Sequence, residues 1–313
     1  MIKRGVTVES PPTDSHEERI AQLPCWPGKL EVSPLSGGMT NRNYRVTSGG
    51  GDYVVRIGRD LPEHGVMRFN ELAAARAAHA AGISPEVVFA SDGVLVSRFI
   101  HGRTLTDADV RRPQMLAPLM DLVRRCHRDI PRHLRGPALT FWVFQVIRNY
   151  AAVLREVPVN PLASRMAGLM TMAQQLEQAI GPIDLVFGHN DLLAANFMDD
   201  GQRLWLIDWD YAGFNSPLFD LANLASNNGF SAEQQEALLA SYFGVAADGQ
   251  RRRAFAAMKS ASLLREVLWG AVSQVKSTID FDYAAYTAEY LARLDGAAFP
   301  MPRSEVGHRA PVR

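Results

Sequence analysis

The chain has 313 residues, a mass of 34.5 kDa, and 33 basic against 33 acidic side chains. This balance gives no reason to expect a nucleic-acid or anionic-membrane partner, and the length allows one large or two moderate hydrophobic cores. Cys25 and Cys126 lack metal-site spacing, no apolar run approaches a membrane span, and the N-terminal residues lack a signal region. We therefore expect a cytoplasmic protein.

Residues 1–100 predict a β-rich lobe that contains one helix. Between Val66 and Ala81 the chain is rich in alanine, carries apolar residues on one side and stops at Gly82, which predicts a helix. Runs of β-branched and aromatic residues between turn signals predict five strands, interrupted by that helix, as an antiparallel meander: Leu30–Gly37, Asn43–Thr47, Tyr53–Ile57, Val87–Phe89 and Val94–Phe99.

Residues 101–300 predict a mostly helical lobe, which follows a connecting segment at Ile100–Arg103. Residues 1–14 and 301–313 are polar or contain proline, and we expect them to be loosely held. The predicted fold class is therefore α+β, with two lobes. Apolar residues recur every three to four positions in seven segments: Pro113–His127, Phe141–Glu156, Leu162–Ile180, Leu218–Ser226, Ala232–Phe243, Gln250–Thr278 and Tyr283–Leu294.

A predicted β-hairpin lies between the third and fourth of these helices. The apolar segment Leu185–Gly188 predicts a buried strand that leads into the loop His189–Asn196. Apolar runs flank the turn signal Asp199–Gly201, so the chain is expected to fold back on itself. The hairpin would return Asp208 toward the end of the loop.

The loop and hairpin together have the form H-x-D-x-x-x-x-N followed by a strand that ends in aspartate. Phosphoryl transfer from ATP needs a carboxylate beside the attacking hydroxyl and oxygen ligands for Mg²⁺. Asp191 is the candidate catalytic base, and Asn196 and Asp208 are the candidate metal ligands. For His189 we predict a structural role, with its ring bonded to backbone near Asp208.

Several segments together resemble the choline/ethanolamine kinase family, within the aminoglycoside-phosphotransferase and protein-kinase-like superfamily. The resemblance implies a bilobal protein-kinase-like fold, with ATP as donor, Mg²⁺ as cofactor, and a primary alcohol on a small cationic amine as acceptor. It also implies that Asp220 stabilises the catalytic loop by hydrogen bonds. The resemblance extends from about Leu35 to Leu294 and is carried by GGMTNRNYRV, HNDLLAAN, LIDWDYAG, FDLANLA and LWGAVSQVKSTIDFDYAAYTAEYL.

The predicted nucleotide site begins with Gly37 and Gly38, where backbone N–H groups could approach phosphate without a side chain in the way. Judged alone, a Gly-Gly pair is more often a simple hairpin turn. Thr40 and Asn41 follow it and could add side-chain donors or acceptors.

Arg56, on the third predicted strand, matches the position of a phosphate-binding basic residue in the family. Its spacing alone is also that of a solvent-facing arginine. Glu71, on the following helix, is its candidate ion-pair partner, although it could equally be a surface acid. Ser97 and Phe99 complete the predicted nucleotide-binding set.

A quaternary ammonium cannot donate a hydrogen bond, so proteins hold it with aromatic faces and nearby negative charge. By resemblance, Trp269 and Tyr286 match the positions of such an aromatic cage. Asp210 and Tyr211, beside the metal site, are the other predicted acceptor-binding residues, and Asp210 could instead touch a second ion. The spacing of Tyr286 and Tyr290 is equally typical of core packing, and we expect Tyr290 to be core.

Two positions depart from the pattern of family members with a well-developed cage. Val272 stands where a second aromatic residue is common, and Asn227 stands where an acidic residue is expected. Such a site would favour choline less and could suit ethanolamine or another alcohol. An aminoglycoside, thiamine or sugar-like acceptor, or a non-catalytic nucleotide-binding role, therefore remains an alternative, and the oligomeric state is left open.

Overall fold

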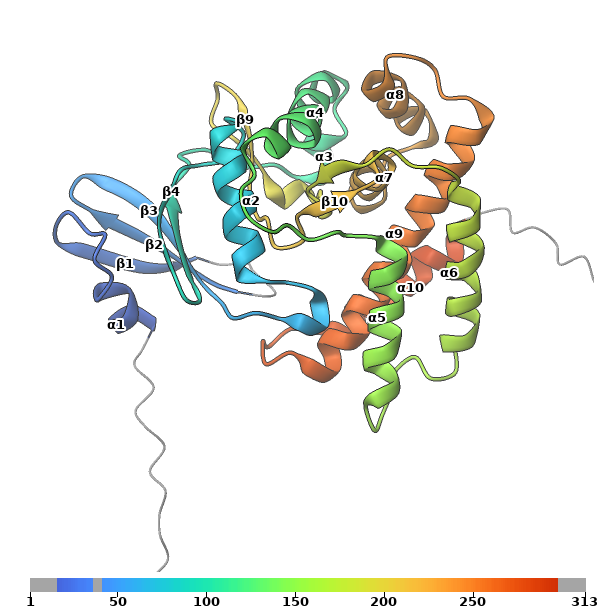
Figure 1. Ribbon diagram of the computed structural model, residues 1–313, viewed down its shortest axis with the longest axis horizontal. Helices are drawn as coiled ribbons and strands as arrows, with labels where there is room; N and C mark the ends of the chain where they lie inside the picture. The colour runs from blue at the N-terminus through green and yellow to red at the C-terminus, as the bar shows by residue number, and fades with distance from the viewer. Residues whose placement is uncertain (1–15, 36–40, 298–313) are drawn as a thin grey trace, which may run out of the picture. The chain divides into compact units, whose positions relative to one another are not determined.

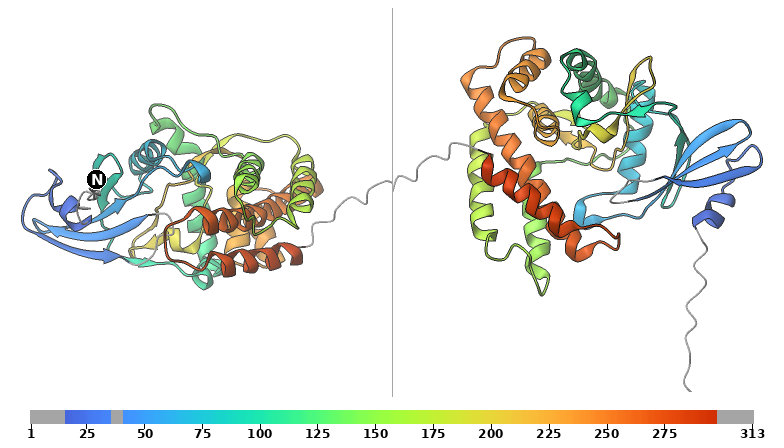
Figure 2. Two further views of the ribbon diagram at one scale, coloured as in Figure 1. Left: turned by 90° about the horizontal axis from the view of Figure 1, so that it is seen from below. Right: turned by 180° about the vertical axis from the view of Figure 1, so that it is seen from behind.

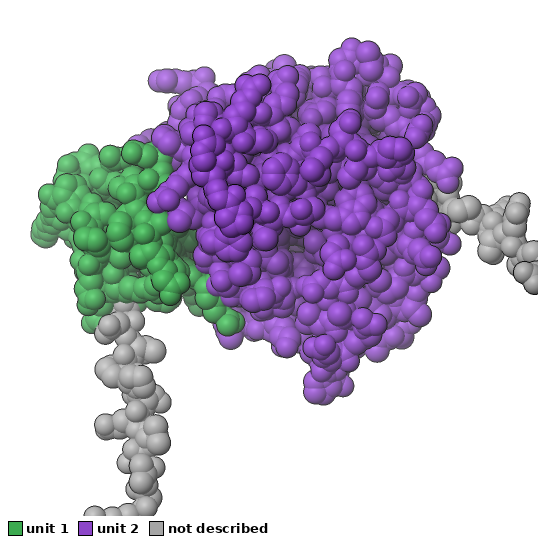
Figure 3. Space-filling view, in the orientation of Figure 1, with its two compact units in different colours: residues 1–59, 86–99 green, residues 60–85, 100–313 purple. Residues whose placement is uncertain are grey.

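The computed structural model describes residues 16–35 and 41–297. The chain forms two compact units, which Figure 3 shows in different colours: unit 1 comprises residues 1–59 and 86–99, and unit 2 comprises residues 60–85 and 100–313. The lobe boundary near residue 100 stays a prediction, and the predicted loose ends lie outside the described residues. Among the described helices, none has the length and apolar character needed to cross a bilayer.

Unit 1 contains a five-stranded antiparallel sheet in the order β1-β2-β3-β5-β4, which confirms the predicted number and direction of strands. The predicted meander order is wrong, because β3 pairs with β5 and places β4 at the edge. Val94 and Val96 of β5 are buried whereas β4 is half-buried, as expected for an inner strand beside an edge strand. The strands are β1 (Leu30–Leu35), β2 (Arg42–Ser48), β3 (Gly51–Ile57), β4 (Val87–Ser91) and β5 (Val94–Arg98).

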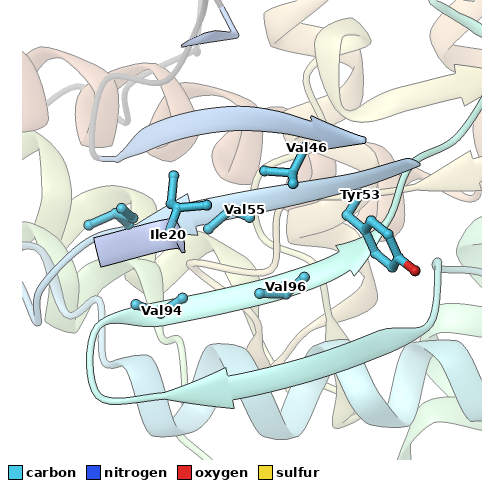
Figure 4. Close-up of a cluster of buried hydrophobic side chains, with 7 residues drawn as sticks. Ile20, Val46, Tyr53, Val55, Val94 and Val96 are labelled. Carbon is cyan, nitrogen blue, oxygen red and sulfur yellow. The ribbon is translucent and has the colours of Figure 1, made fainter. Parts of the chain in front are cut away.

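The hydrophobic core of unit 1 lies between the sheet and a short helix, α1 (His16–Ala21). Ile20 of α1 is fully buried among Val46, Val55 and Val96, as Figure 4 shows. The indole N–H of Trp26 donates to the Ile20 carbonyl (2.7 Å) and closes the end of this helix. A six-residue helix is too short to give a periodic signal, and it was not predicted.

Helix α2 (Arg68–Ala80) confirms the predicted helix but belongs to unit 2, although it lies between two strands of unit 1 in the sequence. The side-chain amide of Asn70 donates to the carbonyl of Ala212 (2.7 Å). Arg125 donates from α4 to the carbonyl of Ala81, just after α2 (2.7 Å). A 3₁₀ turn, η1 (Pro62–His64), precedes α2.

Seven of the other helices described in unit 2 match the seven predicted segments within a few residues at most of their ends, and the four-residue helix α3 was not predicted. Helix α9 is the longest and contacts α5, α6, α7 and α10, as Figures 1 and 2 show. Nearly all of its residues from Ala254 to Ser273 are buried. The helices are α3 (Asp107–Val110), α4 (Leu116–His133), α5 (Val143–Glu156), α6 (Met166–Ile180), α7 (Pro217–Asn227), α8 (Ala232–Phe243), α9 (Gly249–Lys276) and α10 (Tyr283–Gly296), with the 3₁₀ turn η2 (Pro113–Met115) before α4.

Two small sheets in unit 2 flank the loop from residue 189 to residue 196, the predicted catalytic loop, called the catalytic loop below. Strands β7 (Val186–Gly188) and β10 (Gly213–Asn215) pair with each other. Strand β6 (Arg103–Thr104) pairs with β8 (Phe197–Asp199), which forms the predicted hairpin with β9 (Leu204–Leu206). The first residue of β8 directly follows the 3₁₀ turn η3 (Ala194–Asn196), which ends the catalytic loop.

Candidate active site

The catalytic loop is held at its start by Asp220 of α7, which is 1% exposed. One carboxylate oxygen accepts a hydrogen bond from the backbone N–H of Asn190 (2.7 Å). The other accepts one from the backbone N–H of His189 (2.8 Å) and lies 2.9 Å from Nε2 of His127. Burial alone would raise the pKa of Asp220, but these hydrogen bonds and the nearby histidines outweigh it, so the pKa is lowered. The structural role predicted for Asp220 is confirmed.

Asn190 connects the loop to β10 by its side chain. Its backbone is left-handed (φ 66°), a conformation that asparagine tolerates better than most residues. Its amide nitrogen donates to the carbonyls of Tyr211 (2.9 Å) and Gly213 (3.2 Å), and its oxygen accepts from Asn215 (3.0 Å). The residue before Asp191 is thus fixed in a buried network.

The residue after Asp191 is fixed in the same way by α7. The N–H of Leu192 donates to the side-chain oxygen of Asn223 (2.6 Å). Asn228 donates back to the carbonyl of Leu192 (3.0 Å). Asp191 therefore stands between two anchored neighbours, which limits the positions its carboxylate can take.

The predicted metal ligands are brought near each other by the hairpin. The N–H of Ile207, next to Asp208, donates to the carbonyl of Asn196 (3.0 Å). The amide nitrogen of Asn196 donates to the carbonyl of Asp191 (2.8 Å), which leaves the amide oxygen as the group able to face a cation. His189 contacts the carbonyl of Ile207 (2.9 Å) through its ring, and this confirms the structural role predicted for it.

The chemistry of these donors fits Mg²⁺, because a carboxylate and an amide oxygen are hard ligands. Across the described residues, no group of three or more His, Cys, Asp or Glu side chains is arranged to hold a metal ion. Mg²⁺ is commonly held by one or two protein oxygens together with substrate phosphates. The pair Asn196 and Asp208 agrees with that pattern.

The side chain of Asp191 is 16% exposed and lies in an acidic surrounding. Burial raises its pKa to about 7, and the negative charges of Glu266, Asp208 and Asp210 act in the same direction. The guanidinium of Arg265 opposes this rise, with its Nη1 lying 3.4 Å from the Asp191 carboxylate. A carboxylate in such a position can accept a proton near neutral pH.

Arg265 and Glu266 of α9 were not among the predicted site residues. Arg265 is 1% exposed, and its Nη1 donates to the carboxylate of Glu266. Its guanidinium lies 4.3 Å from the centre of the Tyr211 ring. The available signal was a charged pair inside a helix whose neighbouring residues are almost all apolar or small.

The predicted acceptor residues of unit 2 lie together. The indole N–H of Trp269 donates to the hydroxyl of Tyr211 (2.7 Å), and the rings of Trp269 and Tyr286 are 5.3 Å apart, edge to face. The hydroxyl of Tyr286 donates to Glu266 (2.9 Å). Tyr290 is buried and packs against Tyr286, which agrees with its predicted place in the core.

Asp210 and Glu71 share one partner in Arg68. The Nη1 of Arg68 lies 2.8 Å from the carboxylate of Asp210 and 2.6 Å from that of Glu71. This contact joins α2 to the segment that follows Asp208. The predicted pair between Arg56 and Glu71 joins residues of different units and stays a prediction.

The other predicted nucleotide-binding residues belong to unit 1. Arg56 is half-buried on β3, opposite Asn43 of β2. Ser97 is half-buried on β5, and the backbone N–H of Phe99 donates to the carbonyl of Asp52 (3.0 Å). Asn41 is 5% exposed. The remaining three, Gly37, Gly38 and Thr40, lie outside the described residues.

Comparison with known proteins agrees with this geometry. A sequence model of the family described as choline/ethanolamine kinase matches residues 32–240. Protein LicA from Haemophilus influenzae is 29% identical over 270 residues, which cover 83% of this chain and 77% of LicA.

Solved structures show the same fold. A choline/ethanolamine kinase family protein from Mesorhizobium loti has a TM-score of 0.73 at 30% identity, covering 90% of this chain and 93% of that protein. The aminoglycoside phosphotransferase APH(4)-Ia shares the fold at 19% identity, with a TM-score of 0.64 and coverage of 91% and 98%. The predicted α+β, kinase-like fold class is confirmed. The chain therefore belongs to the choline/ethanolamine kinase family and is a small-molecule kinase, a phosphotransferase with an alcohol group as acceptor.

Proposed function

We propose that the chain transfers the terminal phosphoryl group of ATP, with Mg²⁺, to the hydroxyl of a small amino alcohol of the choline and ethanolamine class. The observation that carries this proposal is the anchored position of Asp191, with Asn196 and the Asp208 segment fixed beside it by hydrogen bonds. The match to the choline/ethanolamine kinase family supports the acceptor class.

In this proposal Asp191 accepts the proton of the acceptor hydroxyl or orients that hydroxyl toward the γ-phosphorus. A raised pKa suits this role, because a base with a pKa near the working pH transfers protons efficiently. The anchored residues on both sides of Asp191 keep the carboxylate in place, so less reorganisation is needed when the acceptor binds. Asp191 is thus the residue that acts on the hydroxyl.

Asn196 and Asp208 are the residues that would hold Mg²⁺ by their side-chain oxygens. The ion neutralises charge on the phosphate oxygens when it is bound. The proposed contacts to the nucleotide come from Arg56, Glu71, Ser97 and Phe99, together with the predicted turn of Gly37, Gly38, Thr40 and Asn41. Arg68 would keep Asp210 oriented beside the metal ligands.

The replacement Asp191→Asn tests the proposal. We expect kcat for ethanolamine or choline to fall by about 10²–10⁴-fold, because the proton acceptor is lost while the shape is retained. ADP release would be measured in a coupled assay, and ATP binding by calorimetry, which should change little. Asp184→Asn, at an exposed position just before β7, is the matched control and should behave as wild type. Unchanged turnover in the Asp191 variant would contradict the role given to Asp191.

A further inference from the structure

Arg265 brings a positive charge to the residues predicted to bind the acceptor. It is 1% exposed, and its contacts run through Nη1, which reaches Glu266 and Asp191. Within the described part of the chain, its Nε and Nη2 atoms have no hydrogen-bond partner. A buried arginine that serves as a structural bridge normally uses its whole fork of donors. Arg265 therefore joins Glu266 and Asp191 through one nitrogen and leaves much of its donor fork unused, so its charge is the property that matters beside the acceptor residues.

The guanidinium of Arg265 covers the ring of Tyr211. It lies 4.3 Å from the centre of that ring and 5.8 Å from the centre of the Phe141 ring. A quaternary ammonium ligand binds to aromatic rings by the same attraction between a cation and a π-face. The protein thus supplies its own cation at the ring of Tyr211, one of the predicted acceptor-binding residues.

The rings of the predicted cage, those of Trp269 and Tyr286, also pack against other side chains of the protein. Trp269 is 4% exposed, and its indole packs against His64 (5.5 Å), Tyr283 (5.8 Å) and Tyr286 (5.3 Å). Glu266, the nearby negative charge that could attract the acceptor nitrogen, is also engaged. Its carboxylate accepts hydrogen bonds from Arg265 and from Tyr286. A trimethylammonium group would find Trp269 and Tyr211 buried, Tyr286 half-buried and Glu266 already paired.

The two positions that depart from the family pattern, Val272 and Asn227, also make the site less suited to a quaternary ammonium group. Val272 is fully buried and provides no aromatic wall. Asn227 replaces an expected acid, is 8% exposed, and has no hydrogen-bond partner for its amide atoms among the residues described. It lies on α7, whose Asn223 contacts Leu192 of the catalytic loop. An amide can exchange hydrogen bonds with an N–H or O–H group, but it offers no charge to a trimethylated nitrogen.

We propose that Arg265 is a specificity-determining residue that disfavours quaternary ammonium acceptors, so that the chain phosphorylates an amino alcohol whose nitrogen carries hydrogens. The proposal rests on the proposed function. The guanidinium of Arg265 repels a cation and offsets part of the attraction of Glu266 and Asp191, but an N–H-bearing ammonium can regain binding energy by donating to carboxylate, hydroxyl or amide oxygens. A trimethylated nitrogen has no hydrogen to donate, and so it bears the repulsion without that compensation.

The first test compares kcat/KM for ethanolamine and choline in wild type, Arg265→Met and Arg265→Lys. Wild type should favour ethanolamine by about tenfold or more, and Arg265→Met should lower KM for choline by about tenfold, since a cation–π face becomes available. The lysine variant keeps the charge and should keep the preference. A wild-type preference for choline, or an acceptor ratio unaltered by Arg265→Met, would overturn the proposal.

A binding experiment separates this proposal from the proposed function. Choline alone is titrated calorimetrically into wild type and into Arg265→Met, with Arg265→Gln as a replacement if the methionine variant does not fold. Binding that is at least about tenfold tighter in the variant supports the role of Arg265, even if neither protein phosphorylates an amino alcohol and the proposed function fails. The double variant Arg265→Met with Glu266→Gln removes the uncompensated acid and should keep only the part of the gain that comes from the Tyr211 ring. Equal choline affinity in wild type and variant would refute the role of Arg265.

Discussion

A single buried carboxylate, that of Asp220, fixes the backbone that precedes Asp191, the proposed catalytic residue. It accepts two consecutive N–H groups, those of His189 and Asn190, and neither oxygen faces solvent. Consecutive N–H groups that point to one acceptor require a defined local backbone shape. The position of Asp191 therefore depends on a residue that has no part in the proposed chemistry.

Asp220→Asn should destabilise the protein by about 1–3 kcal/mol near pH 7, because an amide can accept only through one oxygen and presents N–H groups to the other donors. The folded-state pKa of Asp220 lies below its ordinary value. Its contribution is therefore present above about pH 4 and is lost as the pH falls through the folded-state value. Urea unfolding of both proteins at pH 7 and pH 3.5 should show the difference shrinking at the lower pH. The control is Asp121→Asn at an exposed position of α4. A difference that grows on acidification would contradict this account.

The sequence was most informative where one local pattern carries the chemistry. The spacing of Asp191, Asn196 and Asp208 predicted the hairpin that brings them back together, and the structure confirms that hairpin. The role of Arg265 could not be inferred from the sequence. That role depends on its contact with Tyr211, which is distant in the chain and lies beside Arg265 only in the folded protein. Long-range contacts of this kind leave no local pattern.

At the scale of elements, α9 and α10 pack closely at Gly270. A Cβ atom on Gly270 would lie 2.5 Å from Oγ1 of Thr287 and 2.9 Å from a ring carbon of Tyr286. Glycine is therefore required for the approach that places Tyr286 against Trp269. The contact between α9 and α10 therefore positions the two predicted cage residues against each other.

Gly270→Ala should push α10 away from α9 and displace Tyr286. We expect a lower Tm and a higher KM for the acceptor, with a smaller change in kcat, because Asp191 lies on a separate loop. The matched control is Gly168→Ala on α6, where an added Cβ meets nothing within 4 Å. That change should be neutral or stabilising by up to about 1 kcal/mol, as expected when alanine replaces glycine in a helix. A Gly270 variant with unaltered Tm and KM would contradict the packing argument.

Longer elements could be predicted from the sequence more readily than short ones. The long helices of unit 2 could be predicted because an apolar stripe repeats over several turns. The strands β6 and β10 have two and three residues, too few for any alternation to be recognised. The order of β4 and β5 was missed because the local patterns of two apolar strands do not say which of them will be the inner one.

At the scale of the whole chain, α2 belongs to a different unit from the two strands that flank it in the sequence. Strands β3 and β4 belong to unit 1, whereas α2 between them is tied to unit 2 by Asn70 and Arg125. Helix α2 also carries Glu71 and Arg68, and Arg68 reaches Asp210. Its stability should therefore follow that of the helical unit.

Native-state hydrogen exchange can test this assignment. Val55→Ala removes buried methyl groups from the core of unit 1, and Leu119→Ala removes a fully buried side chain from α4 in unit 2. Each should cost about 2 kcal/mol or more in its own unit. We expect the amides of α2 to lose protection in the Leu119 variant and to keep it in the Val55 variant. Loss of α2 protection with Val55→Ala alone would show that the helix unfolds with the sheet.

The left-handed backbone of Asp208 (φ 70°) restricts which amino acids this position can hold. Glycine, asparagine and aspartate adopt that conformation most readily, while glutamate keeps the charge but adopts it poorly. Asparagine keeps the conformation and loses the charge. If Asp208 holds a divalent ion as proposed, aspartate is the amino acid that meets both requirements, that of the backbone geometry and that of the ion.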